Sequence, residues 1–257
     1  YYILVIFSSL VLELMATPAL RVAVINTEDA VIWSPITFAD MFVNLLSACG
    51  EEWNIFNLLP NSTDLPSIDS YDAFVITGSH YDVRDSSTLA WFSPLCDLIR
   101  IISKSPSKRL YGGCYGCQII AHALGGAVDY NPDKKLHLRV DAISLLPSFS
   151  TLRGADTDTR SELSLISAHG DCVSTLPPGA ILLASSEHTQ YEIFTCGNSN
   201  NILAIQSHPE FDYAYAIRDK IWPQTLEFKA VEVVTQERNL FPLGLSFCRL
   251  LVEPFLL

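Results

Sequence analysis

The sequence predicts a doubly wound α/β protein with a mostly parallel sheet and a strand-rich second half. Short apolar, β-branched segments alternate with amphipathic segments through the first half of the 257-residue chain. The connections between these segments are short, which favours parallel strands joined by helices that cover both faces of the sheet. Glycine-containing turns follow two of the predicted strands, at the carboxyl ends where such sheets form their sites.

The first half contains four predicted strands and three predicted helices. Residues 21–26 form an apolar run typical of a buried strand. Ser34 followed by Pro35 predicts the start of a helix, and apolar residues then recur at helical spacing as far as Cys49, before Gly50 ends the helix. The other predicted elements are strands at 51–58, 72–78 and 108–113, a helix at 88–103, and a helix that ends at Gly125 and Gly126.

The second half contains five predicted strands, and the segment beyond about residue 213 is predicted to be helical surface. We expect residues 20–257 to form a single domain and residues 1–19 to be an N-terminal extension. The strands are expected at 140–146, 163–171, 180–186, 191–197 and 201–211.

The apolar run at residues 1–14 is too short to span a bilayer. It is either an extension of a cytosolic protein or the remnant of a signal peptide, which would place the protein in the secretory pathway. The seven cysteines are odd in number and irregularly spaced, as is typical of a reducing compartment. We therefore expect a cytosolic protein.

The composition limits the classes of partner and cofactor. Hydrophobic residues make up 49% of the chain and charged residues 17%, which indicates a folded globular protein. The formal net charge of -12 argues against a nucleic-acid partner, because a phosphate backbone attracts basic surfaces. A structural zinc site needs two ligand pairs, and the sequence offers one C-x-x-C. We expect no metal, no other cofactor and no membrane partner.

The segment GGCYGCQ places Cys114 and Cys117 in a C-x-x-C between a predicted strand and a predicted helix. A redox dithiol can occupy such a position. A single nucleophile on a tight turn accounts for more residues, because it requires small neighbours such as Gly112, Gly113 and Gly116. The N-terminus of the following helix would favour a thiolate and could bind an oxyanion. Cys117 is expected to pack in the core.

A thiol enzyme also needs a base, and His208 is the candidate. Pro209 favours an extended conformation at His208, and residues two apart on an extended backbone share a face. Glu210 can therefore hold one imidazole nitrogen of His208 and leave the other for Cys114. An exposed histidine and glutamate without a role remain the alternative interpretation.

Four segments in order resemble the class I glutamine amidotransferase family, over about residues 20–215. The resemblance implies a flavodoxin-like, doubly wound sheet. The matching segments are the nucleophile turn from Gly112 to Gln118 with Gly125 and Gly126, the oxyanion strand at 76–83, the H-x-D…LP-x-G…A-x-S segment at 167–194, and the His-Pro-Glu from Ser207 to Phe211.

The resemblance implies a thiol hydrolase of γ-glutamyl amides with a triad of Cys114, His208 and Glu210. The backbone N–H groups of Gly78 and Tyr115 would bind the oxyanion. Gln118 would contact the glutamyl group, and His169 would either border the substrate or brace a loop. The expected oxyanion and substrate-binding residues are therefore Gly78, Ser79, Tyr115, Gln118 and His169.

Two positions depart from the family pattern, which usually has His at Cys117 and Gly at Ser207. A Cys114–Cys117 disulfide could switch the enzyme off. Three functions remain open: a free-standing hydrolase of glutamine, glutathione or its conjugates, similar to plant γ-glutamyl peptidases; a glutaminase subunit that passes ammonia to a separate synthetase; and a catalytically silent binding or regulatory homologue. We expect the free-standing hydrolase.

Overall fold

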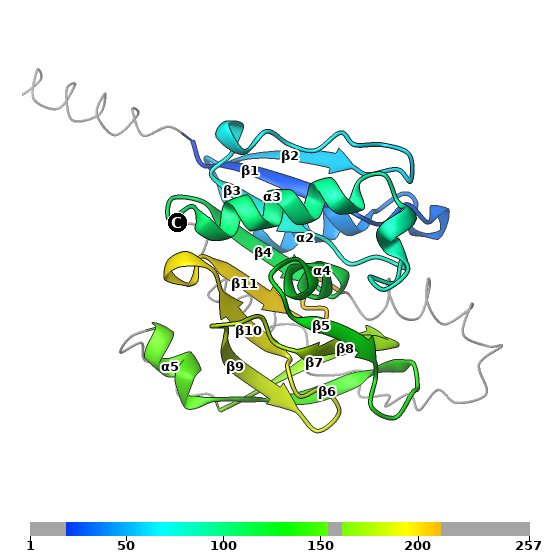
Figure 1. Ribbon diagram of the computed structural model, residues 1–257, viewed down its shortest axis with the longest axis vertical. Helices are drawn as coiled ribbons and strands as arrows, with labels where there is room; N and C mark the ends of the chain where they lie inside the picture. The colour runs from blue at the N-terminus through cyan, green and yellow to red at the C-terminus, as the bar shows by residue number, and fades with distance from the viewer. Residues whose placement is uncertain (1–18, 154–160, 212–257) are drawn as a thin grey trace, which may run out of the picture.

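The computed structural model describes residues 19–153 and 161–211, and a nine-stranded sheet crosses this part of the chain (Figure 1). The strand order is β2-β1-β3-β4-β11-β10-β9-β6-β7. The pairs from β2 to β11 are parallel, and those from β11 to β7 are antiparallel. The strands are β1 (Arg21–Asn26), β2 (Glu52–Asn57), β3 (Ala73–Ile76), β4 (Arg109–Gly113), β6 (His137–Leu145), β7 (Glu162–His169), β9 (Ile181–Ser186), β10 (Ile193–Cys196) and β11 (Ile202–Ile205).

The parallel half of the sheet carries helices on both faces, which confirms the predicted α/β fold. Successive residues of β1 point to opposite sides. Val22 and Val24 pack with α2 (Phe38–Leu46), whereas Ala23 and Ile25 pack with α3 (Phe92–Lys104) and α4 (Tyr115–Ala123). Figure 1 shows α3 and α4 on the near face and α2 behind the sheet. Burial of each valine or isoleucine side chain contributes roughly 1.5–3 kcal/mol.

The strand-rich second half is also confirmed, with one feature that we did not predict. A separate two-stranded antiparallel sheet joins β5 (Ala127–Tyr130) to β8 (Asp171–Thr175), and α4 lies against it. The predicted strand at 163–171 is therefore two strands, because the chain bends at Gly170. A short helix, α5 (Pro147–Arg153), follows β6.

The predicted start of the first helix is wrong, because the cap lies at Thr37 and not at Ser34. Thr37 Oγ1 accepts from the N–H of Asp40 at 3.2 Å, and the Asp40 carboxylate accepts from the N–H of Thr37 at 2.8 Å. This reciprocal pair satisfies two helix-end donors, which fixes the start of α2. The helix ends at Leu46, before Gly50, which has a φ of +89°.

Several predictions fall outside the described residues. These are the helical surface beyond residue 213 and the structure of residues 1–18. In the parts that the structure does describe, no helix is long and apolar enough to cross a membrane. The expected domain limits, cellular location and absence of a nucleic-acid partner stay predictions.

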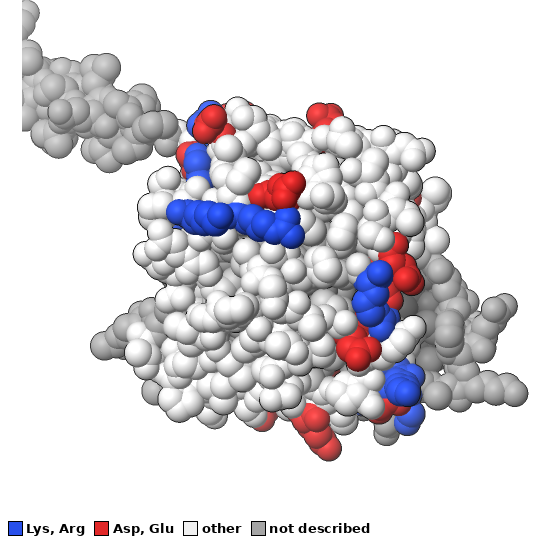
Figure 2. Space-filling model, viewed as in Figure 1, with Lys and Arg blue, Asp and Glu red and all other residues white. Residues whose placement is uncertain are grey.

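Charged side chains are scattered over the face shown in Figure 2, and most of that face is uncharged. Basic side chains lie beside acidic ones in several places. Arg100 Nη1, for example, lies 2.7 Å from Asp97 Oδ1, and both side chains are largely exposed. Such exposed pairs contribute about 0–1 kcal/mol each to stability. The stability of the fold therefore depends mainly on its apolar packing.

The sheet topology brings four loops together. Strands β1, β3, β4 and β11 are parallel, and their carboxyl ends lie at one edge of the sheet. The segments that leave this edge begin at Thr27, Thr77, Cys114 and Gln206. The predicted site residues lie mainly on these segments.

Candidate active site

Cys114 occupies a strained turn between β4 and α4. Its backbone has a φ of +49° and a ψ of -107°, and the residue is 6% exposed. A non-glycine residue held in such a conformation costs about 1–3 kcal/mol. Surrounding structure must therefore impose it: the N–H of Cys114 donates to the carbonyl of Ile205 at 2.8 Å, and its carbonyl accepts from the N–H of Gln118 at 3.1 Å.

The glycines beside Cys114 are required by close backbone contacts. A Cβ atom on Gly116 would lie 2.4 Å from the carbonyl oxygen of Ile76, and one on Gly112 would lie 2.7 Å from backbone atoms of Gly116. Such atoms cannot approach so closely. These contacts confirm the predicted tight turn with small neighbours.

His208 and Glu210 form a buried pair next to Cys114. His208 Nδ1 lies 2.7 Å from Glu210 Oε1, and the two side chains are 2% and 0% exposed. Burial lowers the pKa of His208, but the negative charges of Cys114 and Glu210 outweigh burial and raise it to about 10. The structure therefore brings these three predicted residues together and favours an imidazolium beside the sulfur.

The two nitrogens of the His208 ring have different surroundings. Nδ1 is held by Glu210, whereas Nε2 is buried without a hydrogen-bond partner among the residues that the structure describes. Phe211 stacks on the ring at a centroid distance of 3.9 Å and fixes its plane. Nε2 is thus available for proton transfer, while its ring cannot turn freely.

Two backbone N–H groups near Cys114 have no acceptor within residues 19–153 and 161–211. They belong to Gly78, in the loop after β3, and to Tyr115, the first residue of α4. A Cβ atom on Gly78 would lie 3.3 Å from His208 Cε1, which places this loop beside the histidine. The N–H of Gly116 donates to the carbonyl of Thr77 at 3.1 Å and ties the loop to α4. Free donors so placed can stabilise an oxyanion.

The Ser79 side chain makes hydrogen bonds to the backbone of its own loop and of the loop after β1. Its Oγ donates to the carbonyl of Thr27 at 2.6 Å and accepts from the N–H of Tyr81 at 3.2 Å. The hydroxyl of Ser79 therefore braces the loop, and any contact of Ser79 with a substrate stays a prediction.

Gln118 is the first member of a polar chain that leads to the sulfur. Its Nε2 donates to the Asp171 carbonyl at 3.0 Å and reaches Gln206 Oε1 at 3.5 Å. Gln206 Nε2 in turn lies 3.9 Å from Cys114 Sγ. Sequence analysis missed Gln206, which directly follows β11 and lies two residues before His208.

Asp171 is a partly buried acid beside Gln118. Burial, and then the neighbouring charge of Asp82, raise the pKa of Asp171 to about 6. Its Oδ2 is buried without a hydrogen-bond partner in the described part of the chain. A carboxylate in this state would be stabilised by an incoming cationic group.

His169 is buried in a well-defined neutral state. Asn131 Nδ2 donates to the carbonyls of Lys135 and His169 at 2.8 Å each, so Asn131 Oδ1 is an acceptor. It lies 3.0 Å from His169 Nδ1, which must therefore carry the proton. Burial, and then the charges of His137 and His208, lower the pKa of His169 to about 3. His169 braces this turn, and its predicted contact with substrate stays a prediction.

Cys117 lies in the apolar interior behind the turn. It is fully buried among the side chains that join α4 to the sheet. Burial, and then the charge of Cys114, raise the pKa of the Cys117 thiol well above its usual value. A thiol in this state is a packing residue, as expected. A disulfide between the two cysteines stays a prediction.

A second buried carboxylate, Glu192, lies behind the His208 segment. Its two oxygens accept from the hydroxyls of Ser207 and Ser186, each at 2.8 Å. Burial raises the pKa of Glu192 to about 7, although these hydroxyls oppose the shift. The hydroxyl of Ser207, which departs from the family pattern, thus has the Glu192 carboxylate as its hydrogen-bond acceptor.

The raised pKa of Glu192 predicts that stability falls as pH rises. The folded state holds the proton more tightly than the unfolded state, so Glu192 favours folding most below pH 4.5, and this contribution is lost as pH rises to about 7. The difference between these two pKa values corresponds to about 3 kcal/mol. The quantity to compare is the free energy of unfolding of Glu192→Gln minus that of the wild type. This difference should be more positive at pH 8 than at pH 4.5.

The measurement is urea denaturation of both proteins at the two pH values. The difference between the Glu192→Gln variant and the wild type removes the contributions of other titrating groups, including Asp171. A difference that does not change with pH would show that Glu192 ionises normally in the folded state.

The family model described as glutamine amidotransferase class-I matches residues 36–215. The chain belongs to the class I glutamine amidotransferase family. Gamma-glutamyl peptidase 3 of Arabidopsis thaliana is 32% identical over 181 residues, which cover 68% of this chain and 69% of that protein.

Two further comparisons concern a longer enzyme and a solved structure. A glutamine-hydrolysing GMP synthase from a Wolbachia species that is named with Brugia malayi is 24% identical over 68% of this chain and 33% of its own length. The crystal structure of a glutamine amidotransferase from Thermotoga maritima superposes with a TM-score of 0.66 at 20% identity, covering 92% of this chain and 98% of that one. That likeness confirms the fold.

Proposed function

We propose that this amidotransferase-family protein hydrolyses a γ-glutamyl amide through a thioester on Cys114. The sulfur attacks the γ-carbonyl carbon, and the N–H groups of Gly78 and Tyr115 stabilise the resulting oxyanion. The C–N bond then breaks, and the amine leaves with a proton from His208 Nε2. Water, deprotonated by His208, attacks the thioester and releases glutamate, which restores the thiol.

One observation carries this proposal: a strained, buried Cys114 lies beside a histidine whose other nitrogen is fixed by a buried glutamate. The negative charge of Cys114 raises the pKa of His208, so the two side chains are electrostatically coupled. A thiol next to an imidazolium is the arrangement that activates a cysteine nucleophile. Two unpaired backbone donors at the same turn complete the set that acyl transfer requires.

The substrate proposed is a γ-glutamyl peptide such as glutathione or one of its conjugates, handled without a partner. The relatives named gamma-glutamyl peptidase, at 32% identity, favour this choice. A glutaminase subunit that supplies ammonia to a synthetase is the second candidate, favoured by the match to the GMP synthase.

Trapping the acyl-enzyme tests the proposal. The purified protein is mixed with glutamine, glutathione, a glutathione conjugate or a γ-glutamyl anilide, quenched in acid within seconds, and digested for mass spectrometry. We expect a γ-glutamyl adduct on the peptide that contains Cys114, with the modification on Cys114 and not on Cys117. Absence of an adduct with every donor would contradict the mechanism and favour a silent binding homologue.

Glutamate release separates the two enzymatic candidates. A free-standing peptidase should release glutamate from glutathione at the same rate with or without an added synthetase. Turnover of glutamine that rises only when a synthetase is added would instead support the subunit.

A further inference from the structure

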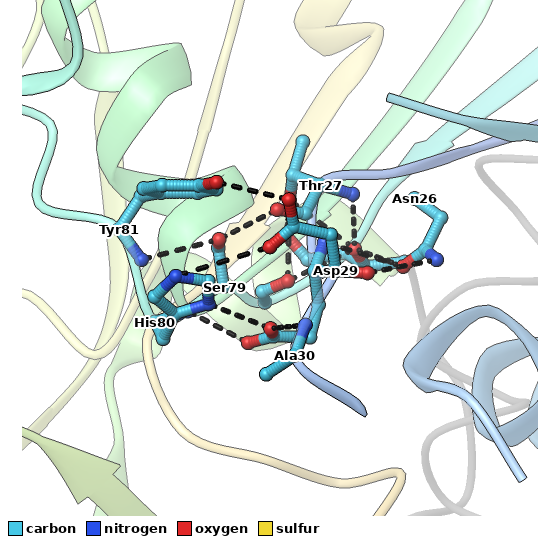
Figure 3. Close-up of polar contacts among 10 residues, drawn as sticks. Asn26, Thr27, Asp29, Ala30, Ser79, His80 and Tyr81 are labelled. Carbon is cyan, nitrogen blue, oxygen red and sulfur yellow. Dashed lines mark hydrogen bonds and ion pairs between the residues drawn. The ribbon is translucent and has the colours of Figure 1, made fainter. Parts of the chain in front are cut away.

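The loop at residues 77–80 is bonded to the loop at residues 27–30, which follows the neighbouring strand β1. The N–H of Thr27 donates to Thr77 Oγ1 at 3.0 Å, and Ser79 Oγ donates to the Thr27 carbonyl (Figure 3). The Thr27 hydroxyl also donates to the carbonyl of Gly78 at 3.1 Å. The loop that carries the free Gly78 N–H is therefore hydrogen-bonded to Thr27, the residue that directly follows β1.

Glu28 adds the charged part of this contact, and its side chain is 3% exposed. Glu28 Oε1 accepts from the N–H of Ala30 and from His80 Nδ1, at 2.7 Å each. Glu28 Oε2 accepts from the N–H of His80, also at 2.7 Å. A buried carboxylate is tolerated only where donors satisfy it, and hydrogen bonds to a charged acceptor are the strong ones. The two donors of His80 therefore link the loops, and the N–H of Ala30 holds the carboxylate within its own loop.

Glu28, Asp29 and His80 are also of the types that bind metal ions, and one ligand atom of each lies within 4.8 Å of the others. Both oxygens of Glu28, however, already accept hydrogen bonds at 2.7 Å. Asp29 Oδ2 accepts from the hydroxyl of Tyr81 at 3.0 Å. Each of these side chains is thus already held by hydrogen bonds within the protein.

We propose that Glu28 is a positioning residue that holds the Gly78 N–H where the oxyanion forms. The proposal rests on the hydrolase function proposed above. The Tyr115 N–H belongs to helix α4, whereas the Gly78 N–H belongs to a loop whose placement depends on its contacts. Glu28 anchors His80, two residues after Gly78. A displacement of about 1 Å at such a group can lower the rate by about 100-fold.

The test is Glu28→Gln, which keeps the size of the side chain. Its amide nitrogen would face the N–H of either Ala30 or His80, so one of the three bonds must break. The neutral amide also loses the charge that strengthens the bonds from His80, whichever way the amide is placed. We expect kcat for a γ-glutamyl anilide to fall by about 10- to 100-fold, with KM within about threefold, because the oxyanion forms only after binding. The rate at which iodoacetamide alkylates Cys114 should not change. Asp29→Asn, a matched control on the next residue, should keep kcat within about twofold.

Hydrogen exchange gives a readout that is independent of turnover. The amide of His80 is bonded to Glu28, so it should exchange about tenfold faster in Glu28→Gln and at the wild-type rate in Asp29→Asn. If Glu28→Gln does not fold, His80→Ala replaces it. That variant keeps the backbone bond and loses the ring bond, and we expect a threefold to tenfold lower kcat.

An unchanged kcat and unchanged His80 exchange in Glu28→Gln would overturn the proposal, as would a change in KM alone. Failure of the hydrolase function itself has a different signature. In that case the wild-type protein releases no glutamate from any donor, while the exchange of His80 still depends on Glu28.

Discussion

Replacing Cys114 with serine is expected to lower kcat/KM for a γ-glutamyl amide by about 10⁴-fold, equivalent to about 5.5 kcal/mol in activation free energy. A serine hydroxyl stays neutral at physiological pH. The variant therefore loses the proposed thiolate nucleophile and the negative charge beside His208. The free donors of Gly78 and Tyr115 would remain, which leaves residual catalysis over water. Glutamate release under substrate-limited conditions measures this loss.

Two observations keep this result interpretable. Cys49→Ser, which changes an exposed cysteine, should retain full activity. The Cys114→Ser protein should also unfold at the wild-type temperature, because serine has nearly the same shape. Activity within tenfold of the wild type would show that Cys114 is not the nucleophile.

Replacing Gly116 with alanine is expected to lower the free energy of unfolding by about 3–4 kcal/mol. The new Cβ atom would lie 2.4 Å from the carbonyl oxygen and 3.0 Å from the carbonyl carbon of Ile76. Both contacts are with backbone at the end of a central strand, so a side-chain rotation cannot relieve them. The helix α4 must move away from β3, which also breaks the bond between Gly116 and Thr77. Urea denaturation measures the loss.

Gly170→Ala is the matched control for this substitution. Gly170 lies in the bend between β7 and β8, and a Cβ atom there would meet no heavy atom within 4 Å. Its unfolding free energy should stay within about 0.5 kcal/mol of the wild type. Equal stabilities for the two variants would contradict the close packing of α4 on β3.

The sequence predicted the parallel core well because local patterns specify it. Strand β1 begins and ends at the predicted residues, and the neighbouring glycines correctly predicted the strained turn at Cys114. The cap at Thr37 was missed because Ser34 and Pro35 offered a competing signal three residues earlier. The bend at Gly170 was missed because a single glycine separates β7 from β8.

Parts of the candidate site could not be predicted because they depend on strand neighbours. Glu28 carries no motif, and it meets His80 only because β1 and β3 are paired in parallel. Glu192 lies on a loop between two antiparallel strands, and its high pKa reflects burial that the sequence does not specify. The approach of Gln206 to Cys114 likewise follows from the pairing of β4 with β11.

The pairing of β4 with β11 has a consequence for synthesis of the chain. The sulfur of Cys114 and the amide of Gln206 meet across 92 residues of sequence, and His208 follows two residues later. During translation Cys114 therefore leaves the ribosome long before His208, its proposed base. Until β11 inserts between β4 and β10, Cys114 lacks the neighbouring histidine that the proposed reaction requires. Completion of the sheet and the pairing of Cys114 with its proposed base are thus the same event.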